Sequence, residues 1–263
     1  MRSVAGVTLM ETLIALALTG IVSLAIFKTY VTQHQHYIAQ DDITTVQQNA
    51  RACIDEMTRQ IRMAGFKLPT GLNALRATNS NPDTLAIIYR ADTTQAVLAA
   101  TMASNGADMV CTGSIGGFIV SQWAYIFEPD SGGGEFFVIA GINNGTKQIS
   151  HAALSKAYRK DAIVLVIAWT QYYLDKSDPN HPNLMVRTNN GGAQVYAEDI
   201  SDLQFQFRLN NGTVVDVPPL VSDVREVLIA VTGRSHQTDA ETPGQPYRYR
   251  TYTSSVNVRN LTS

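Results

Sequence analysis

The stretch AGVTLMETLIALALTGIVSLAIFKTY, residues 5–30, decides the fold of this chain. Glu11 is the only charged residue between positions 7 and 27, a segment of about 21 residues that would be roughly 32 Å long as a helix. That length is enough to cross the hydrocarbon core of a bilayer. A carboxylate buried in hydrocarbon is costly unless a partner neutralises it, so Glu11 needs an explanation of its own.

A secretory signal peptide is one ordinary explanation of such a segment. It has a basic beginning, a shorter apolar core and a cleavage site of small residues after that core. Residues 1–6 contain one basic side chain, Arg2, and no such site stands out after the apolar run. Hydropathy alone leaves open a plain uncleaved anchor, in which Glu11 would lie at the level of the lipid headgroups.

A second helical pattern follows, between Asp41 and Ala64. Its apolar residues recur at steps of three and four, which is typical of an amphipathic helix with a narrow packing stripe. They are Ile43, Val46, Ala50, Cys53, Met57, Ile61 and Ala64. Gly65 is a candidate C-cap, and Pro69 prevents continuation. We therefore predict one helix over residues 8–64, roughly 85 Å long, that is apolar all round only in its first half.

The pattern changes after Pro69. Runs rich in β-branched and aromatic residues predict strands at 84–90, 117–128, 135–141, 162–174, 203–209, 225–234 and 247–258. Asn-Gly turns at 143–146 and 210–213 favour hairpins. In LQFQFRL, residues 203–209, alternate side chains are apolar, so one face should cover the helix stripe. The sequence thus predicts an α+β fold, with one β-rich domain on the second half of the helix and its sheet whole or split into two parts.

The composition and motifs point away from catalysis. The net charge of −2 argues against a surface for polyanions. No nucleophile elbow, phosphate-binding loop, dinucleotide fingerprint or zinc-ligand spacing is present. His34 and His36 point apart on a helix, and the other histidines are scattered, while the oxygen-rich loop at 175–183 does not match an EF-hand. We assign no catalytic residue, no metal ligand and no cofactor, and interpret the chain as not an enzyme.

Two features leave alternatives open. The only cysteines are Cys53 and Cys111, and a disulfide between them would tie the helix to the β-rich domain. The alternative is a small apolar Cys53 on the packing stripe and an unrelated Cys111. Tyrosine and arginine alternate over residues 247–252, which could stack on single-stranded nucleic acid, although packing of these side chains across strands is the favoured interpretation.

The start of the chain resembles the class III signal of type IV pilins and type II secretion pseudopilins. The resemblance lies in Gly6, the VTLME that follows it and the apolar helix after that. In this family a membrane peptidase, the prepilin peptidase, cuts after the glycine and methylates the new N-terminus. The resemblance implies cleavage between Gly6 and Val7, methylation of Val7, and Glu11 as the fifth residue of the mature chain. The family usually has phenylalanine where this chain has Val7.

The same resemblance implies a role for Glu11 in assembly. In a pilus the apolar helices bundle side by side and exclude water. The carboxylate of Glu11 would then pair with the α-amino group of Val7 on a neighbouring subunit, since opposite charges attract strongly in a dry core and an unpaired one is costly. Such a pair would set the axial register between subunits. The implied partners are other major and minor pilins, and inner-membrane lipid before assembly.

Later segments narrow the resemblance. QQNARACIDEMTRQIRMAGF, residues 47–66, is similar to minor pilins of the PilW type and less closely to the J-type pseudopilin, and residues 196–209 and 247–260 also look like the PilW-type family. The resemblance implies a pilin-like fold in four parts. These are a leader at 1–6, a membrane and filament-core helix at 7–30, an amphipathic helix half at 31–65 and an antiparallel β-rich domain at 66–263.

The implied function is that of a minor pilin. The chain would cross the inner membrane once, with its domain in the periplasm, and then enter an extracellular pilus at or near the tip, with priming of assembly as one role. The alternative within the family is a J-type pseudopilin of a type II secretion system. A membrane-tethered periplasmic enzyme is a different class, and a nucleic-acid partner is not expected.

Overall fold

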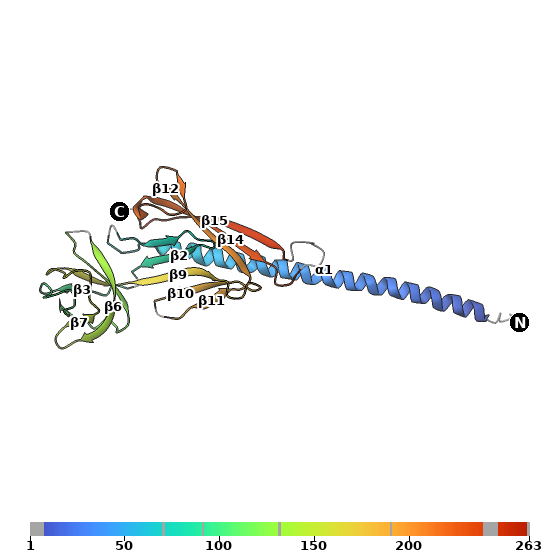
Figure 1. Ribbon diagram of the computed structural model, residues 1–263, viewed down its shortest axis with the longest axis horizontal. Helices are drawn as coiled ribbons and strands as arrows, with labels where there is room; N and C mark the ends of the chain where they lie inside the picture. Colours follow the sequence, from blue (N-terminus) through green and yellow to red (C-terminus); the bar gives the residue numbers. More distant parts are fainter. Residues whose placement is uncertain are drawn as a thin grey trace.

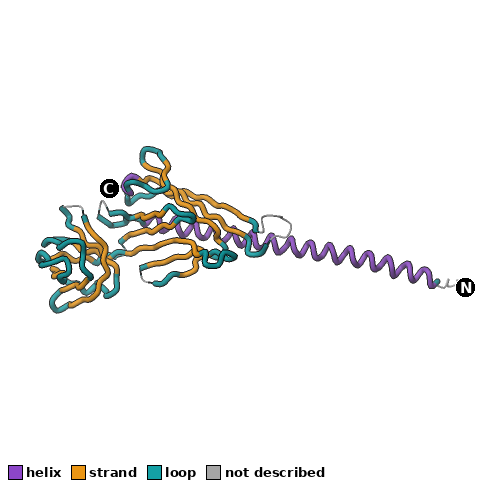
Figure 2. Tube along the Cα trace, in the orientation of Figure 1, coloured by secondary structure: helices purple, strands orange, loops and turns teal. Residues whose placement is uncertain are grey.

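A single long helix dominates the computed structural model, which describes residues 8–69, 72–90, 92–130, 133–189, 191–238 and 247–261. Helix α1 runs over Leu9–Met63, with Thr8 as N-cap and Ala64 as C-cap. This confirms the helix predicted over residues 8–64. The helix leaves the β-rich body about halfway along its length, and its first half extends alone (Figures 1 and 2).

The end of α1 depends on a glycine. Gly65 adopts a φ of +76°, the left-handed region that disfavours side chains, and its N–H donates to the carbonyl of Ile88 at 3.0 Å. A Cβ at this position would lie 2.5 Å from the carbonyl oxygen of Asn260. The side-chain amide of Asn260 in turn donates to the carbonyl of Arg62 at 3.0 Å. The last turn of α1 is thereby fastened to the end of the chain.

Two antiparallel sheets pack on the second half of α1. The five-stranded sheet has the order β1 (Leu75–Thr78), β2 (Thr84–Tyr89), β9 (Ala168–Asp175), β10 (Asn183–Thr188), β11 (Gln194–Ala197). The four-stranded sheet has the order β13 (Val214–Val215), β12 (Ile200–Leu209), β14 (Val224–Arg234), β15 (Tyr249–Asn257). A short 3-10 helix, η1 (Val221–Asp223), precedes β14. Helix α1 contacts β14 and β15 of one sheet and β2 and β11 of the other.

The main hydrophobic core lies between α1 and the two sheets. The helix contributes Ala50, Cys53, Ile54, Met57, Ile61 and Ala64 to this core. Val46 is also buried, whereas Ile43 of the predicted stripe is only half-buried. Strand β12 buries Leu203, Phe205, Phe207 and Leu209 in the same core, which confirms the predicted alternation. Each large apolar side chain buried in this way contributes about 1.5–3 kcal/mol to folding, which holds the helix against the sheets.

A closed antiparallel barrel forms a second lobe at the end of the molecule away from the N-terminus of α1 (Figure 1). Its strands, in spatial order, are β3 (Gln95–Leu98), β4 (Met109–Thr112), β7 (Gln148–His151), β6 (Gly134–Asn143), β5 (Trp123–Phe127) and β8 (Ile163–Val166). It has a hydrophobic core of its own, which includes Leu98, Met109 and Ile126. The sequence analysis did not separate this lobe from the rest of the β-rich region.

Two apolar runs at the barrel explain why the sequence analysis did not separate it from the rest of the β-rich region. The apolar run at 162–174 looks continuous, but it forms β8 in the barrel and β9 in the five-stranded sheet, with Ile167 between them. Of the run at 117–128, only residues 123–127 form a strand. The Asn-Gly turns at 143–146 and 210–213 do connect paired strands, as predicted.

A third, smaller cluster joins the barrel to the body. Ile88, Tyr125 and Ile167 form its buried centre. The indole rings of Trp123 and Trp169 pack against it and meet edge to face, with their centroids 6.3 Å apart. We call these five residues the neck cluster.

Candidate functional site

The first half of α1 exposes a large apolar surface. Its exposed large side chains are Leu9, Met10, Leu13, Ile14, Leu16, Leu18, Ile21, Val22, Leu24, Ile26 and Phe27. None of its most apolar 18-residue window is buried, and the helix is long and apolar enough to cross a membrane. Soluble proteins rarely expose contiguous apolar patches of this extent. Such a surface is suited to an apolar environment, and a membrane is one that the helix is long and apolar enough to cross.

Glu11 lies at the start of this surface and is engaged by the N-cap. Its Oε2 accepts hydrogen bonds from the backbone N–H of Thr8 at 2.8 Å and from the Thr8 hydroxyl at 3.0 Å. The Glu11 N–H donates to the Thr8 hydroxyl oxygen at 3.3 Å. This reciprocal arrangement is a capping box, which satisfies donors at the helix start. The Thr-x-x-Glu spacing before an apolar run is readable from sequence, although the sequence analysis did not use it.

Gly6 and Val7, the residues of the expected peptidase cut and methylation, lie outside the described residues. The described chain begins at Thr8, directly beside this expected processing point.

The two cysteines are not bonded to each other. Both are free and buried, and they belong to different hydrophobic clusters, Cys53 to the main core and Cys111 to the barrel. Burial raises the pKa of Cys53 to about 12 and that of Cys111 to about 11. The disulfide that the sequence left open is therefore not formed, because the barrel carries Cys111 into a separate lobe.

The tyrosines near the end of the chain pack against arginines from other elements. The guanidinium carbon of Arg234, at the end of β14, lies 4.0 Å from the ring centroid of Tyr247. That of Arg51, on α1, lies 6.0 Å from the ring centroid of Tyr252. The favoured interpretation is correct in one respect, because tyrosine rings and arginines do pack against each other. The arginines come, however, from α1 and β14 and not from the alternating segment itself.

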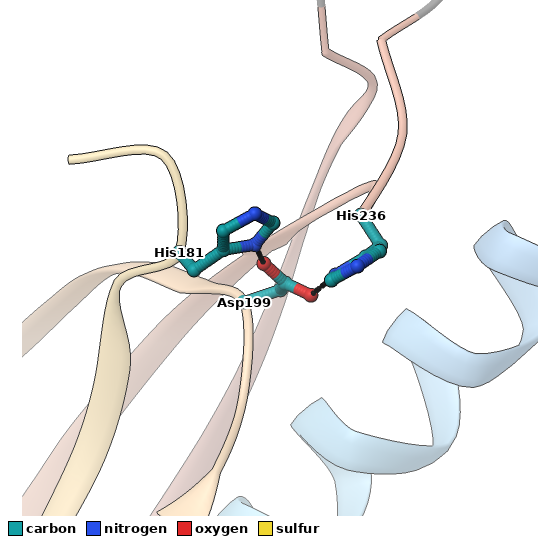
Figure 3. Close-up of side chains that lie close together, drawn as sticks. All are labelled: His181, Asp199 and His236. Atoms are coloured by element: carbon teal, nitrogen blue, oxygen red, sulfur yellow. Dashed lines mark hydrogen bonds and ion pairs between the residues drawn. The ribbon is translucent and has the colours of Figure 1, made fainter. Parts of the chain in front are cut away.

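A cluster of two histidines and one carboxylate lies where the two sheets meet α1 (Figure 3). His181 belongs to the loop before β10, Asp199 to the turn between β11 and β12, and His236 follows β14 directly. The Nδ1 atom of His181 lies 3.2 Å from Asp199 Oδ1, and the Nδ1 atom of His236 lies 2.7 Å from Asp199 Oδ2. The two imidazole centroids are 4.5 Å apart. We call these three residues the His–Asp–His cluster.

Backbone hydrogen bonds hold the three segments of this cluster together. Asp199 has a φ of +57°, and its carbonyl accepts a bond of 2.9 Å from the N–H of Arg234, two residues before His236. The N–H of Ile200 donates to the carbonyl of Pro182 at 3.0 Å, which fixes the loop of His181. The backbone therefore holds the three side chains close together.

The charged groups around Asp199 differ in their exposure to solvent and in their hydrogen bonds. The Asp199 side chain is 9% exposed, against 42% for His181 and 58% for His236. The buried Arg234 donates from Nη1 to the carbonyl of Pro179, while its Nη2 lies 4.0 Å from Asp199 Oδ1. The hydrogen bond to Asp199 raises the pKa of His236, against the opposing effect of burial. The cluster thus brings two imidazoles, one buried carboxylate and one buried guanidinium together.

Sequence reasoning missed this cluster for a plain reason. The two histidines lie 18 and 37 residues from Asp199 along the chain, so no local spacing connects them. Each member offers one ligand atom, and these atoms all lie within 4.8 Å of one another. The oxygen-rich loop at 175–183 uses its carboxylates differently, because Asp175 and Asp178 accept local bonds from the backbone of Ser177 and Asn180.

Comparison of the chain with models of known protein families, with curated proteins and with solved structures finds no match.

Proposed function

We propose that the chain is a minor pilin of the PilW type, a structural subunit with no catalysis of its own. One observation carries this proposal: a single helix is apolar and exposed over its first half and packed into a globular core over its second half. The exposed half needs an apolar environment, whereas the second half already buries its apolar stripe against the two sheets. A bilayer, and then a bundle of like helices, would supply that environment.

The proposed mechanism depends on the burial of Glu11 once the chain enters a filament. In the membrane before assembly, the carboxylate lies at the helix start, where the Thr8 donors stabilise it. In a filament the same carboxylate would enter a dry bundle, where the α-amino group of Val7 on an adjoining subunit supplies the opposite charge. An ion pair in such a core is stable only with good geometry and satisfied hydrogen bonds, so it would accept one axial register and reject others.

The position of the β-rich body fits display at a pilus tip. The barrel lies at the opposite end from the apolar half of α1, so it would point away from the membrane (Figure 1). A subunit with this shape would have its helix in the inner membrane, its body in the periplasm, and its barrel foremost once it enters a pilus. A J-type pseudopilin would use the same apolar helix and the same ion pair, and would differ in belonging to a secretion system.

Intact-mass measurement of the chain from its own cells tests the proposal. The mature protein should lack residues 1–6 and carry one additional methyl group on Val7. A Gly6→Ala variant should be cleaved less completely and keep its full mass in part, because the resemblance implies a peptidase that depends mainly on the glycine. A wild-type chain that starts at Met1, or one that is cut after Phe27, would overturn the proposal in favour of a plain anchor or a secreted protein.

A further inference from the structure

We propose that His181, Asp199 and His236 form a binding site for a transition-metal dication, for which Zn²⁺ is the best match. This inference rests on the geometry of the His–Asp–His cluster and is independent of the proposed role in a pilus. A bound ion would connect the two sheets beside α1.

The donor set selects the class of metal. Two imidazole nitrogens and one carboxylate suit zinc, copper, nickel or cobalt, whereas calcium and magnesium prefer sites made wholly of oxygen. The three ligand atoms already lie within 4.8 Å of one another. Around a tetrahedral zinc ion with bonds of about 2.0–2.1 Å, neighbouring ligand atoms are about 3.3 Å apart, so the side chains need to move little. Three protein ligands leave a fourth position for water.

The solvent exposure of the three side chains also suits a metal site. His181 and His236 are partly exposed, which gives an ion a path from solvent, while Asp199 is nearly buried and held by the backbone. An ion bound here would take the place of the contacts between the two Nδ1 atoms and the carboxylate, because each ligand atom must offer the ion a free lone pair.

Arg234 is the group that most affects this site. Its positive charge opposes a dication, and its buried Nη2 has no hydrogen-bond partner among the described residues. Nη2 lies 4.0 Å from Asp199 Oδ1, the oxygen that His181 now occupies. A carboxylate oxygen has a second lone pair, so Oδ1 can accept a bond from Nη2 after a small movement of either side chain. Ligating carboxylates are commonly held by such an outer partner, and Arg234 is placed to serve as one here.

The placement of the ligands predicts what the ion would do. His181 leads into β10 of the five-stranded sheet, and His236 follows β14 of the four-stranded sheet. Next to His236, the N–H of Gln237 donates to the carboxylate of Asp42 on α1 at 3.0 Å. An ion would therefore cross-link both sheets at the point where the exposed half of α1 leaves the body (Figures 1 and 3).

The test uses the full chain in detergent micelles, purified without a histidine tag and stripped of metal with a chelator. Titration with Zn²⁺ alone, followed by calorimetry, should give one site per chain. His181→Ala and His236→Ala should each weaken binding at least about tenfold, since even loss of an outer partner costs that much at known sites. His34→Ala removes a histidine from α1 outside the cluster and should leave binding unchanged.

A second measurement guards against variants that merely misfold. Asp199→Asn keeps the shape of the side chain and tolerates a positive φ, so it should fold and yet bind Zn²⁺ at least about tenfold more weakly. In the wild-type chain Co²⁺ should produce the intense visible absorption of a four-coordinate site. A wild-type chain that binds no Zn²⁺, or a His181→Ala/His236→Ala double variant that binds it with wild-type affinity, would overturn the proposal.

Discussion

Glu11 has one role in the structure and would have a second under the proposed function. In the isolated chain it closes the capping box with Thr8, and in the proposed filament it also meets a neighbour's α-amino group. Its local bonds would lower the cost of burying the carboxylate, because two of its hydrogen-bond sites are already used. The carboxylate is thus held in place before a partner arrives.

Glu11→Ala tests the proposed role in assembly. We expect the variant to be cleaved and to stay in the membrane, because the apolar helix is intact. Its incorporation into filaments should fall by about tenfold or more, since removing one partner of a buried ion pair costs on the order of 3 kcal/mol. Immunoblots of sheared pili and membranes would measure this. Asp41→Ala removes an acid from the same helix outside the apolar segment and should incorporate normally. Wild-type incorporation of Glu11→Ala would rule out the charge pair.

The cysteines provide a second prediction for single residues. With the pKa of Cys53 near 12 and that of Cys111 near 11, almost no thiolate exists at pH 8, and both side chains are buried. Native protein should therefore react with an aromatic disulfide reagent at least about a hundredfold more slowly than a free thiol does. Both thiols should react after unfolding, in the absence of any reductant. Two unreactive sulfurs in the unfolded chain would indicate a disulfide and contradict the structure.

Among the elements, α1 and β14 approach each other closely at a glycine. A Cβ on Gly233 would lie 2.5 Å from Cγ1 of Val46, whose branched side chain has few alternative rotamers. Gly233→Ala should therefore destabilise the body by about 1–3 kcal/mol, as other overpacked cores are. Thermal unfolding followed by circular dichroism would measure the loss.

A shorter side chain at position 46 should relieve the same clash. Val46→Ala shortens the helix side chain, so the Val46→Ala/Gly233→Ala double variant should be more stable than the sum of the two single changes predicts. Gly192→Ala is the matched control, because a Cβ there would have no neighbour within 4 Å. Strict additivity of the two changes would show that the helix does not dock on β14 at this point.

In the barrel, one carboxylate connects β6 to the loop before β8 through hydrogen bonds. Glu135 accepts bonds from the N–H and hydroxyl of Ser155, the latter at 2.7 Å, and from the Tyr158 hydroxyl at 3.0 Å. Burial alone would raise the pKa of Glu135, but these bonds outweigh burial and lower it below 4.5. Since the unfolded chain has the higher pKa, the stabilisation is present above pH 4.5 and is lost as the pH falls through the folded pKa.

Glu135→Gln tests this account. At neutral pH it should destabilise the barrel by about 1.5–3 kcal/mol, the usual worth of hydrogen bonds to a charged group. The difference from wild type should shrink as the pH falls below 4.5, because the wild-type carboxylate then becomes neutral as well. Hydrogen exchange resolved to the barrel strands would measure both effects. Asp130→Asn, at an exposed position outside the barrel strands, should leave exchange unchanged.

Local patterns predicted the elements that local interactions determine. The end of α1 near Gly65, most of its buried stripe and the alternation of β12 were predicted, and the capping box at the start of α1 could have been, since each depends on residues within a few positions of one another. The barrel was not readable, because β3, β4 and β7 have only four residues each and gain stability by closing on distant strands. The His–Asp–His cluster was missed for the same reason, as its members meet only through the arrangement of the two sheets.

At the scale of the whole molecule, the barrel is an insertion into a hairpin. Tyr89, the last residue of β2, pairs directly with Ala168, the first residue of β9. All the barrel strands lie between these two residues in sequence. The barrel has a separate core, and the neck cluster is the apolar contact that joins it to the body. The strands that α1 contacts most, β14, β15, β2 and β11, all belong to the body.

A shortened chain tests this independence. Replacing residues 90–167 with an Asn-Gly turn should leave β2 and β9 paired, because their ends are already adjacent and this turn suits a two-residue hairpin. The variant removes Cys111, so Cys53 becomes a single reporter of the main core. If the body folds alone, Cys53 should stay as unreactive as in full-length Cys111→Ala, and circular dichroism should retain the helical signal of α1. Under the proposed function, this chain should still enter pili and lack only the outermost surface. Rapid reaction of Cys53 in the shortened chain would mean that the body needs the barrel to fold, and that the two cores form one cooperative unit.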